Sequence, residues 1–178
     1  MGRRQGEVDR TRSAILAAAR DVVSEHGRAI SMGTVAERAG VSRITLYNQF
    51  GSKERLLEAL AAGMSPRAGN GPAPESTDPR DDLRRHIEQV CVAWSADPSV
   101  YRRLESHLLQ GHNGEHHALA ARLASHDQLR PGCSIKEAED VIGALTSFAV
   151  FDRLHKDGRR SPTAVAEILM RMAAEFLA

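Results

Sequence analysis

Between residues 27 and 52 the chain alternates helix-stopping and helix-starting residues so closely that only short helices fit. Gly27 and Gly40 are helix stops, while Ser31 and Ser42 are natural N-caps for helices that begin one residue later. An isolated helix of about two turns is only marginally stable in water. Each short helix therefore needs a core to pack on, and the sequence predicts an all-α domain built from capped helices.

A longer helical pattern over residues 9–26 precedes the short helices and supplies an apolar stripe for that core. A second helix is expected over residues 32–39 and a third directly after Ser42, which leaves a turn of about three residues between them. This spacing is typical of a helix-turn-helix. The residues of the apolar stripe are Ile15, Leu16, Ala19, Val22 and Val23.

The third helix has a buried side and an exposed side when its residues are placed at 100° intervals. Leu46 and Phe50 lie about 40° apart and mark the buried side. Asn48 lies opposite their mid-line, with Ile44 and Thr45 flanking it. The border positions are Arg43, Tyr47 and Gln49.

The side chains on this exposed face have the chemistry of a helix that enters the major groove of DNA. Polar groups read base edges, an apolar side chain contacts a thymine methyl, and Arg, Tyr and Thr bond phosphates. Ser52 caps a fourth helix whose first residue is Lys53, so free N–H groups and an ammonium predict a phosphate site there. The alternative is that these residues are ordinary solvated side chains on a three-helix core.

The segment TVAERAGVSRITLYNQFGSKERLLEAL, residues 34–60, closely resembles the DNA-binding segment of the tetracycline-repressor-type (TetR) family of bacterial transcriptional regulators. The resemblance begins with SAILAAARDVVSEHG and covers about the first 60 residues. It implies a three-helix helix-turn-helix DNA-binding domain followed by a helical ligand-binding and dimerisation domain. By position, Tyr47 and Lys53 inherit phosphate contacts. Other groove or backbone contacts are expected from Ser31, Met32, Gly33, Ser42, Arg43, Ile44, Thr45, Asn48 and Gln49.

Three positions depart from the family's pattern. Ile44 stands where a small residue is common, Gln49 where histidine is common, and Gly33 where a longer polar side chain is common. The operator sequence of a relative is therefore not transferable to this chain. Gly33 and Ile44 are also the signs of an alternative function, an all-α small-molecule-binding or interaction module without operator binding.

Two domains are expected, joined by a segment rich in proline and glycine. The expected boundaries are 1–63 for the DNA-binding domain, 64–79 for the linker or long loop, and 80–178 for the helical ligand-binding and dimerisation domain. Residues 1–66 hold ten Lys or Arg against seven Asp or Glu, whereas residues 67–178 hold fourteen against sixteen. This basic excess at the front permits a nucleic-acid partner without requiring one.

The second half reads as a series of amphipathic helices whose main role is core packing. Helices are expected from Leu83, from Asp97-Pro98, from Asn113, over residues 135–156, and from Ser161-Pro162 to the end. The resemblance implies a ligand cavity, with lining candidates Cys91, Trp94, Leu104, His107, Leu108, Phe148 and Phe151. It also implies dimerisation through the last two helices, with candidates Ile142, Leu145, Ala149, Ile168, Leu169, Met172 and Phe176.

Other functional classes find little support in the residues. No apolar run reaches a membrane span and no signal peptide is evident, so a cytoplasmic protein is expected. Cys91 and Cys133 form no C-x-x-C pair, and no catalytic pairing or cofactor motif is present, so no enzyme and no cofactor is expected. A metal site stays open only as an alternative, because the spacing completes no recognised ligand set. The histidines concerned are His107, His112, His116, His117 and His126.

The residues and the resemblance together predict a homodimeric, ligand-responsive transcriptional regulator, more often a repressor in this family. Its partners would be a double-stranded DNA operator of roughly palindromic sequence and an unknown small-molecule effector.

Overall fold

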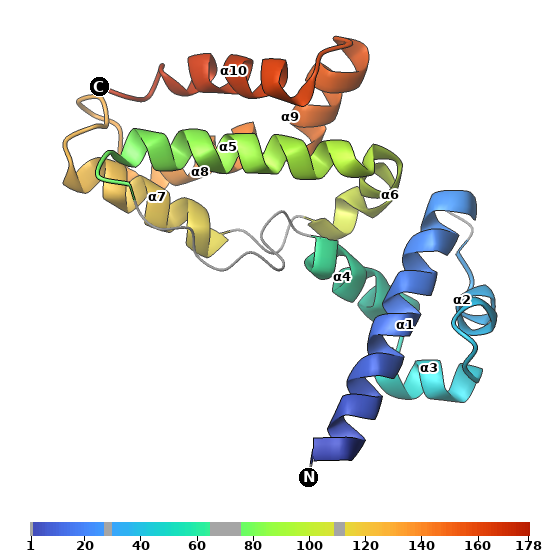
Figure 1. The fold of residues 1–178 in the computed structure, drawn as a ribbon. Helices are drawn as coiled ribbons and strands as arrows, with labels where there is room; N and C mark the ends of the chain where they lie inside the picture. The colour runs from blue at the N-terminus through green and yellow to red at the C-terminus, as the bar shows by residue number, and fades with distance from the viewer. Residues whose placement is uncertain (1, 27–29, 65–75, 109–112) are drawn as a thin grey trace. The chain divides into compact units, whose positions relative to one another are not determined.

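The computed structural model describes residues 2–26, 30–64, 76–108 and 113–178. In these ranges the regular elements are helices, accompanied by a single isolated bridge between Leu129 and Leu177 (Figure 1). The predicted all-α fold is confirmed. The chain divides into two compact units: residues 1–65 with 99–108 form the first unit, and residues 66–98 with 109–178 form the second unit.

The first unit contains α1 (Gly2–His26), α2 (Met32–Arg38), α3 (Arg43–Phe50), α4 (Lys53–Met64) and most of α6 (Pro98–Leu108). The predicted stripe on α1 lies in the core, with Leu16 at its edge. However, α1 begins at Gly2 rather than near Asp9. Its first turns escaped the prediction because their described side chains are mostly exposed, so apolar periodicity does not mark them.

The predicted N-caps of the two short helices are confirmed. The Ser31 hydroxyl accepts from the Thr34 N–H at 3.0 Å, and the Ser42 hydroxyl accepts from the Thr45 N–H at 3.0 Å. Gly51 ends α3 with φ = +76°, a conformation that glycine adopts without steric cost. The helix-turn-helix spacing is thus fixed by side-chain caps at its starts and by a glycine at its end.

Residues of α6 belong to the first unit, although the sequence placed them in the second domain. Val100 and Leu104 lie in the core of the first unit, and the Tyr101 hydroxyl donates to the Met64 carbonyl at 2.8 Å. The Arg103 guanidinium donates to two carbonyls at the end of α1, those of Val23 and Ser24. Pairing the free carbonyls of a helix end in this way is a long-range contact, which sequence periodicity does not reveal.

The second unit contains α5 (Pro79–Ala96), α7 (Asn113–Ser125), α8 (Ile135–Leu145), α9 (Phe148–Asp152), the π-helical turn η1 (Arg153–Asp157) and α10 (Pro162–Ala173). Helix α5 lies beside α10 and also packs on α7, while α8 packs on both α7 and α10 (Figure 1). The apolar stripe predicted on α5 is buried as expected. Among the described helices none is both long and apolar enough to cross a membrane.

Two helix predictions in the second unit are wrong, one in the middle of the helix and one at its end. The single helix expected over residues 135–156 is interrupted, because the Thr146 and Ser147 hydroxyls donate to the carbonyls of Ile142 and Ala144 at 2.7 and 2.8 Å. Ser147 then caps α9. The last helix ends at Ala173, so Phe176 lies beyond it in a turn. The Phe176 carbonyl accepts from the backbone N–H of Arg130 at 3.1 Å.

Candidate nucleic-acid interface

Helix α3 presents the face that the sequence predicted. Leu46 and Phe50 are 0% and 5% exposed and anchor the helix in the core of the first unit. Ile44 is 74% exposed and Tyr47 is 49% exposed, and Asn48 is exposed beside them. An isoleucine so open to solvent contributes nothing to the core of its own unit, whereas it suits contact with an apolar group on a partner.

The serine and threonine hydroxyls among the expected contacts are already bonded within the first unit. Ser42 and Thr45 share a hydrogen bond of 2.8 Å between their hydroxyls, and Ser31 and Thr34 share another of 2.8 Å. These serines therefore hold the starts of α2 and α3. A hydroxyl oxygen with two lone pairs still has capacity for a further bond.

The start of α2 places its first two residues in different environments. Met32 is 8% exposed and lies in the core, which leaves its backbone as the part available to a partner. Gly33 lies directly under the side chain of Arg43, since a Cβ added at Gly33 would be 2.6 Å from a terminal guanidinium nitrogen. The two short helices thus approach each other through a glycine and an arginine.

Arg12 on α1 is a residue that the sequence analysis missed. Its guanidinium carbon lies 4.4 Å from the centre of the Phe50 ring, and its Nη1 donates to the Gln49 carbonyl at 3.3 Å. The face of an aromatic ring attracts a cation, and so does the partial negative charge at the C-terminal end of a helix. Arg12 therefore ties the end of α3 to α1. The available signal was its place three residues before Ile15, at the edge of the predicted stripe.

Helix α4 starts as predicted, with Lys53 half-buried at its first position. The Ser52 hydroxyl accepts from the Arg55 N–H at 3.2 Å, so Ser52 acts as the predicted cap. Helix α3 ends at Phe50 and α4 begins at Lys53, which keeps the lysine close in sequence to the exposed face of α3. The first unit therefore carries the predicted DNA-contacting residues on α2, α3 and the start of α4.

The residues expected to line an effector cavity are divided between the two units. Leu104 is fully buried in the core of the first unit, which also includes residues 107 and 108. The remaining candidates lie in the second unit, where Trp94 and Phe148 meet edge to face with centroids 5.6 Å apart. Phe148 and Phe151 follow at 6.4 Å. This aromatic cluster is well packed core, in agreement with the simpler interpretation of the stripes.

A groove of about 380 Å³ lies between α5 and α10 of the second unit. It contains none of the candidates for effector binding. Three arginines and one glutamate give it a mainly cationic lining. The lining residues are Arg80, Arg84, Glu167, Met170, Arg171, Ala174 and Leu177.

Most residues expected at a dimer interface are buried within the protomer. The exceptions are Met172, which is 47% exposed, Ala149, which is exposed, and Ile168, which is half-buried. The others support the core of the second unit, so a dimer would have to use the outward residues of these helices. Those buried candidates are Ile142, Leu145, Leu169 and Phe176.

A buried polar cluster in the second unit was not predicted. His86 Nδ1 lies 2.5 Å from the Glu115 carboxylate, and the ring of His86 meets His116 edge to face at 5.5 Å. The Thr146 hydroxyl donates to Ile142, so it accepts from Nε2 of His116, which lies 3.3 Å away. Sequence periodicity places His86 on the buried stripe of α5, and that was the signal available.

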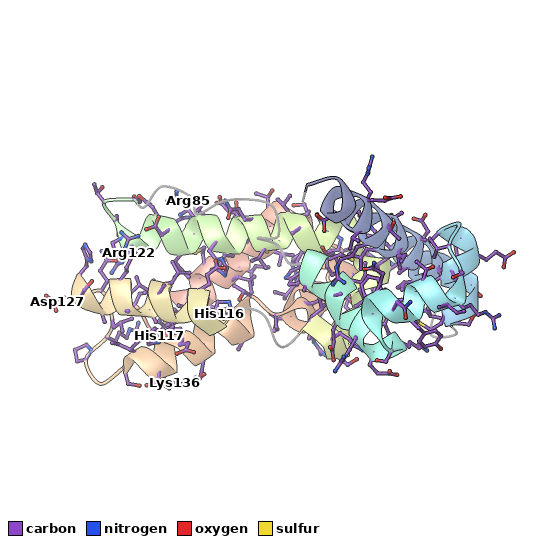
Figure 2. All side chains as sticks on the ribbon, turned by 90° about the horizontal axis from the view of Figure 1, so that it is seen from below. Arg85, His116, His117, Arg122, Asp127 and Lys136 are labelled. Atoms are coloured by element: carbon purple, nitrogen blue, oxygen red, sulfur yellow. The ribbon has the colours of Figure 1, made fainter. Side chains whose placement is uncertain are left out.

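The neighbouring histidine on α7 has a different environment (Figure 2). His117 is exposed and its Nδ1 lies 3.2 Å from a carboxylate oxygen of Glu139. In the described ranges, no three His, Cys, Asp or Glu side chains converge in the way that a metal site needs. His112, one of the histidines of the metal alternative, lies outside the described residues.

The two cysteines differ in burial, and we expect them to differ in reactivity. Burial, assisted by Glu88, raises the pKa of the Cys91 thiol to about 12. Because the thiolate is the reactive form, its fraction at pH 8 should be about a thousandfold below that of an ordinary thiol. Cys133 is only half-buried. Iodoacetamide at pH 8 should therefore label Cys133 first, as read by peptide mass spectrometry.

Denaturant provides the control for this labelling, because it should make both cysteines react at similar rates. Equal labelling of the two residues in the native protein would contradict the buried position of Cys91.

Residues 15–60 match the family model described as bacterial regulatory proteins, tetR family. The HTH-type transcriptional regulator UidR of Escherichia coli is 41% identical over 61 residues, which make up 34% of this chain and 31% of UidR. The match thus spans about a third of the length of the curated relatives. The family match over residues 15–60 falls on α1 to α4.

Two solved structures share the fold over nearly the whole chain. NalD, the secondary repressor of the MexAB-OprM multidrug efflux pump in Pseudomonas aeruginosa, has a TM-score of 0.68 at 22% identity, over 96% of this chain and 97% of NalD. FadR from Bacillus subtilis, in complex with stearoyl-CoA, has a TM-score of 0.73 at 17% identity, over 90% of this chain and 96% of FadR. The capped short helices α2 and α3 thus lie within residues 15–60, the segment of this chain that matches the tetR family of bacterial regulatory proteins.

Proposed function

We propose that this protein is a transcriptional regulator that binds an operator in double-stranded DNA through α3. The observation that carries the proposal is the side-chain arrangement of α3: Leu46 and Phe50 hold it in the core while Ile44, Tyr47 and Asn48 face outward. An exposed apolar side chain, a phenol and an amide on one anchored helix match what direct readout in the major groove uses. Such a protein acts where the chromosome is, in the cytoplasm.

The proposal extends to a homodimer that represses its target genes. A two-fold dimer presents two copies of α3, so the operator is expected to be roughly palindromic, with half-sites one or more DNA turns apart. The outward residues Met172 and Ala149 support an interface on the last helices. NalD, which has a similar fold, is a repressor.

A small-molecule effector is proposed to act through the second unit, which contains residues 80–98 and 109–178 of the expected ligand-binding domain. FadR, whose fold is similar, was solved with a bound acyl-CoA. In the proposed mechanism the effector binds more tightly to a dimer conformation in which the two copies of α3 are wrongly spaced for the operator. Effector binding therefore increases the fraction of dimers that cannot bind the operator.

A gel shift with the DNA upstream of the protein's own gene tests the proposal. Retardation at low salt that an unrelated duplex does not compete away is the expected result. No retardation at low salt would reject operator binding, and would favour the all-α binding module without DNA contact.

Two substitutions on α3 should separate affinity from specificity. Tyr47→Phe removes a hydroxyl expected on a phosphate, so binding should weaken by a similar factor, about threefold to tenfold, on every duplex. Asn48→Ala removes an amide expected at a base edge, so it should change the preference between duplexes. Fluorescence anisotropy with the operator and a scrambled duplex measures both. A changed preference in Tyr47→Phe would contradict the phosphate role.

A further inference from the structure

Gly33 is a glycine that the backbone of α2 does not require. It is the second residue of α2, and its φ is outside the left-handed region that glycine favours, unlike the φ of Gly40 and Gly51. Alanine is a better helix former than glycine at such a position. The reason for a glycine must therefore be sought in the space around it.

That space is occupied by the guanidinium of Arg43. A Cβ built on Gly33 would lie 2.6 Å from Nη2, 3.0 Å from Cζ and 3.1 Å from Nε of Arg43, and these are the three nearest heavy atoms. A separation of 2.6 Å essentially never occurs for a real Cβ atom. Any side chain at position 33 would therefore displace the guanidinium, which is the free end of a flexible side chain, without disturbing the core.

The Arg43 side chain is exposed, and it makes no hydrogen bond or ion pair with the residues that the structure describes. It is the first residue of α3 and immediately precedes Ile44, the most exposed apolar residue of the interface. A guanidinium carries five N–H donors in a planar fork that matches phosphate oxygens. A cationic fork that no described residue pairs with, at the junction of α2 and α3, suits an anionic partner.

We propose that the Arg43 guanidinium, lying over Gly33, binds a phosphate of the DNA backbone, and that Gly33 is the positioning residue that sets where this guanidinium lies. The inference rests on the proposed function. From the sequence alone, the glycine at position 33 was a sign that DNA binding had been lost. In this proposal the same glycine contributes to DNA binding.

The experiment measures the Kd of the full chain for two duplexes, one selected from a random pool by the unsubstituted protein and one unrelated, over a series of salt concentrations. The variants are Gly33→Ala, Arg43→Ala and their combination. Gly63→Ala is the matched control, because Gly63 lies near the end of α4 and an added Cβ there would meet nothing within 4 Å.

Gly33→Ala and Arg43→Ala should each weaken binding to both duplexes about fivefold, the upper end of what one exposed ion pair contributes. Each should also lower the slope of log Kd against log salt by about 0.9, the loss of one phosphate contact. The combination should be no worse than Arg43→Ala alone, because both changes remove the same contact. Gly63→Ala should leave affinity and slope unchanged, and thermal unfolding should show all four variants folded.

Three results would overturn the inference. An unchanged salt slope in Gly33→Ala, with normal binding by the unsubstituted protein, rejects the positioning role alone. An Arg43→Ala variant that alters preference between the duplexes while keeping the slope assigns the guanidinium to a base and not to a phosphate. Absence of binding by the unsubstituted protein at low salt rejects the proposed function, and this inference with it.

Discussion

Replacing Leu46 by alanine is expected to lower the free energy of unfolding by about 2–5 kcal/mol, the range for large-to-small changes in a packed core. Leu46 is fully buried and, with Phe50, it attaches α3 to the core of the first unit. A helix of eight residues has little stability of its own, so α3, which carries the interface, should detach from the core when Leu46 is truncated. Denaturant titration followed by far-UV circular dichroism measures the change, and DNA binding should be lost with it.

Ile44→Ala is the matched control on the same helix. Because Ile44 is 74% exposed, its truncation should change the free energy of unfolding by less than about 0.5 kcal/mol. It should nevertheless weaken the preference for duplexes that place a thymine methyl against this residue. If Ile44→Ala destabilised the protein as much as Leu46→Ala, the assignment of the two sides of α3 would be wrong.

The parts of the fold that sequence predicted well are those fixed by local rules. The caps at Ser31 and Ser42 use a serine hydroxyl and an N–H three residues later, so they are legible in a short stretch of sequence. The burial of Leu46 and Phe50 follows from helical periodicity alone. These two rules were sufficient to define the exposed face of α3.

The features that sequence did not predict are of two kinds. In one, side-chain hydroxyls compete with backbone N–H groups for helix carbonyls; in the other, residues far apart along the chain are in contact. The break after Leu145 arises because the hydroxyls of Thr146 and Ser147 compete for helix carbonyls, and the same residues are tolerated inside other helices. The contact of Arg12 with Phe50 joins residues 38 positions apart, counted from 12 to 50. The space that Gly33 leaves for Arg43 is a property of two packed helices, so neither residue reveals it alone.

The buried pair of His86 and Glu115 is expected to give the second large effect on stability. His86→Leu or Glu115→Leu should each lower the free energy of unfolding by about 3 kcal/mol, because each leaves a polar partner buried without its neighbour. The double replacement should cost clearly less than the sum, with a coupling of about 1 kcal/mol or more, since the atoms lie 2.5 Å apart. Fluorescence of Trp94, on the same helix as His86, reports the unfolding of this unit.

His117 and Glu139 provide the matched control for the buried pair. They also form a His–Glu contact from α7 to the next helix, at 3.2 Å, but the His117 side chain is 62% exposed. An exposed pair contributes about 0–1 kcal/mol, so His117→Leu should change the transition little. The loss in free energy of unfolding on replacing the histidine would then depend on burial and not on the chemical identity of the pair. Additive effects of His86→Leu and Glu115→Leu, within about 0.5 kcal/mol, would show that the two side chains do not depend on each other.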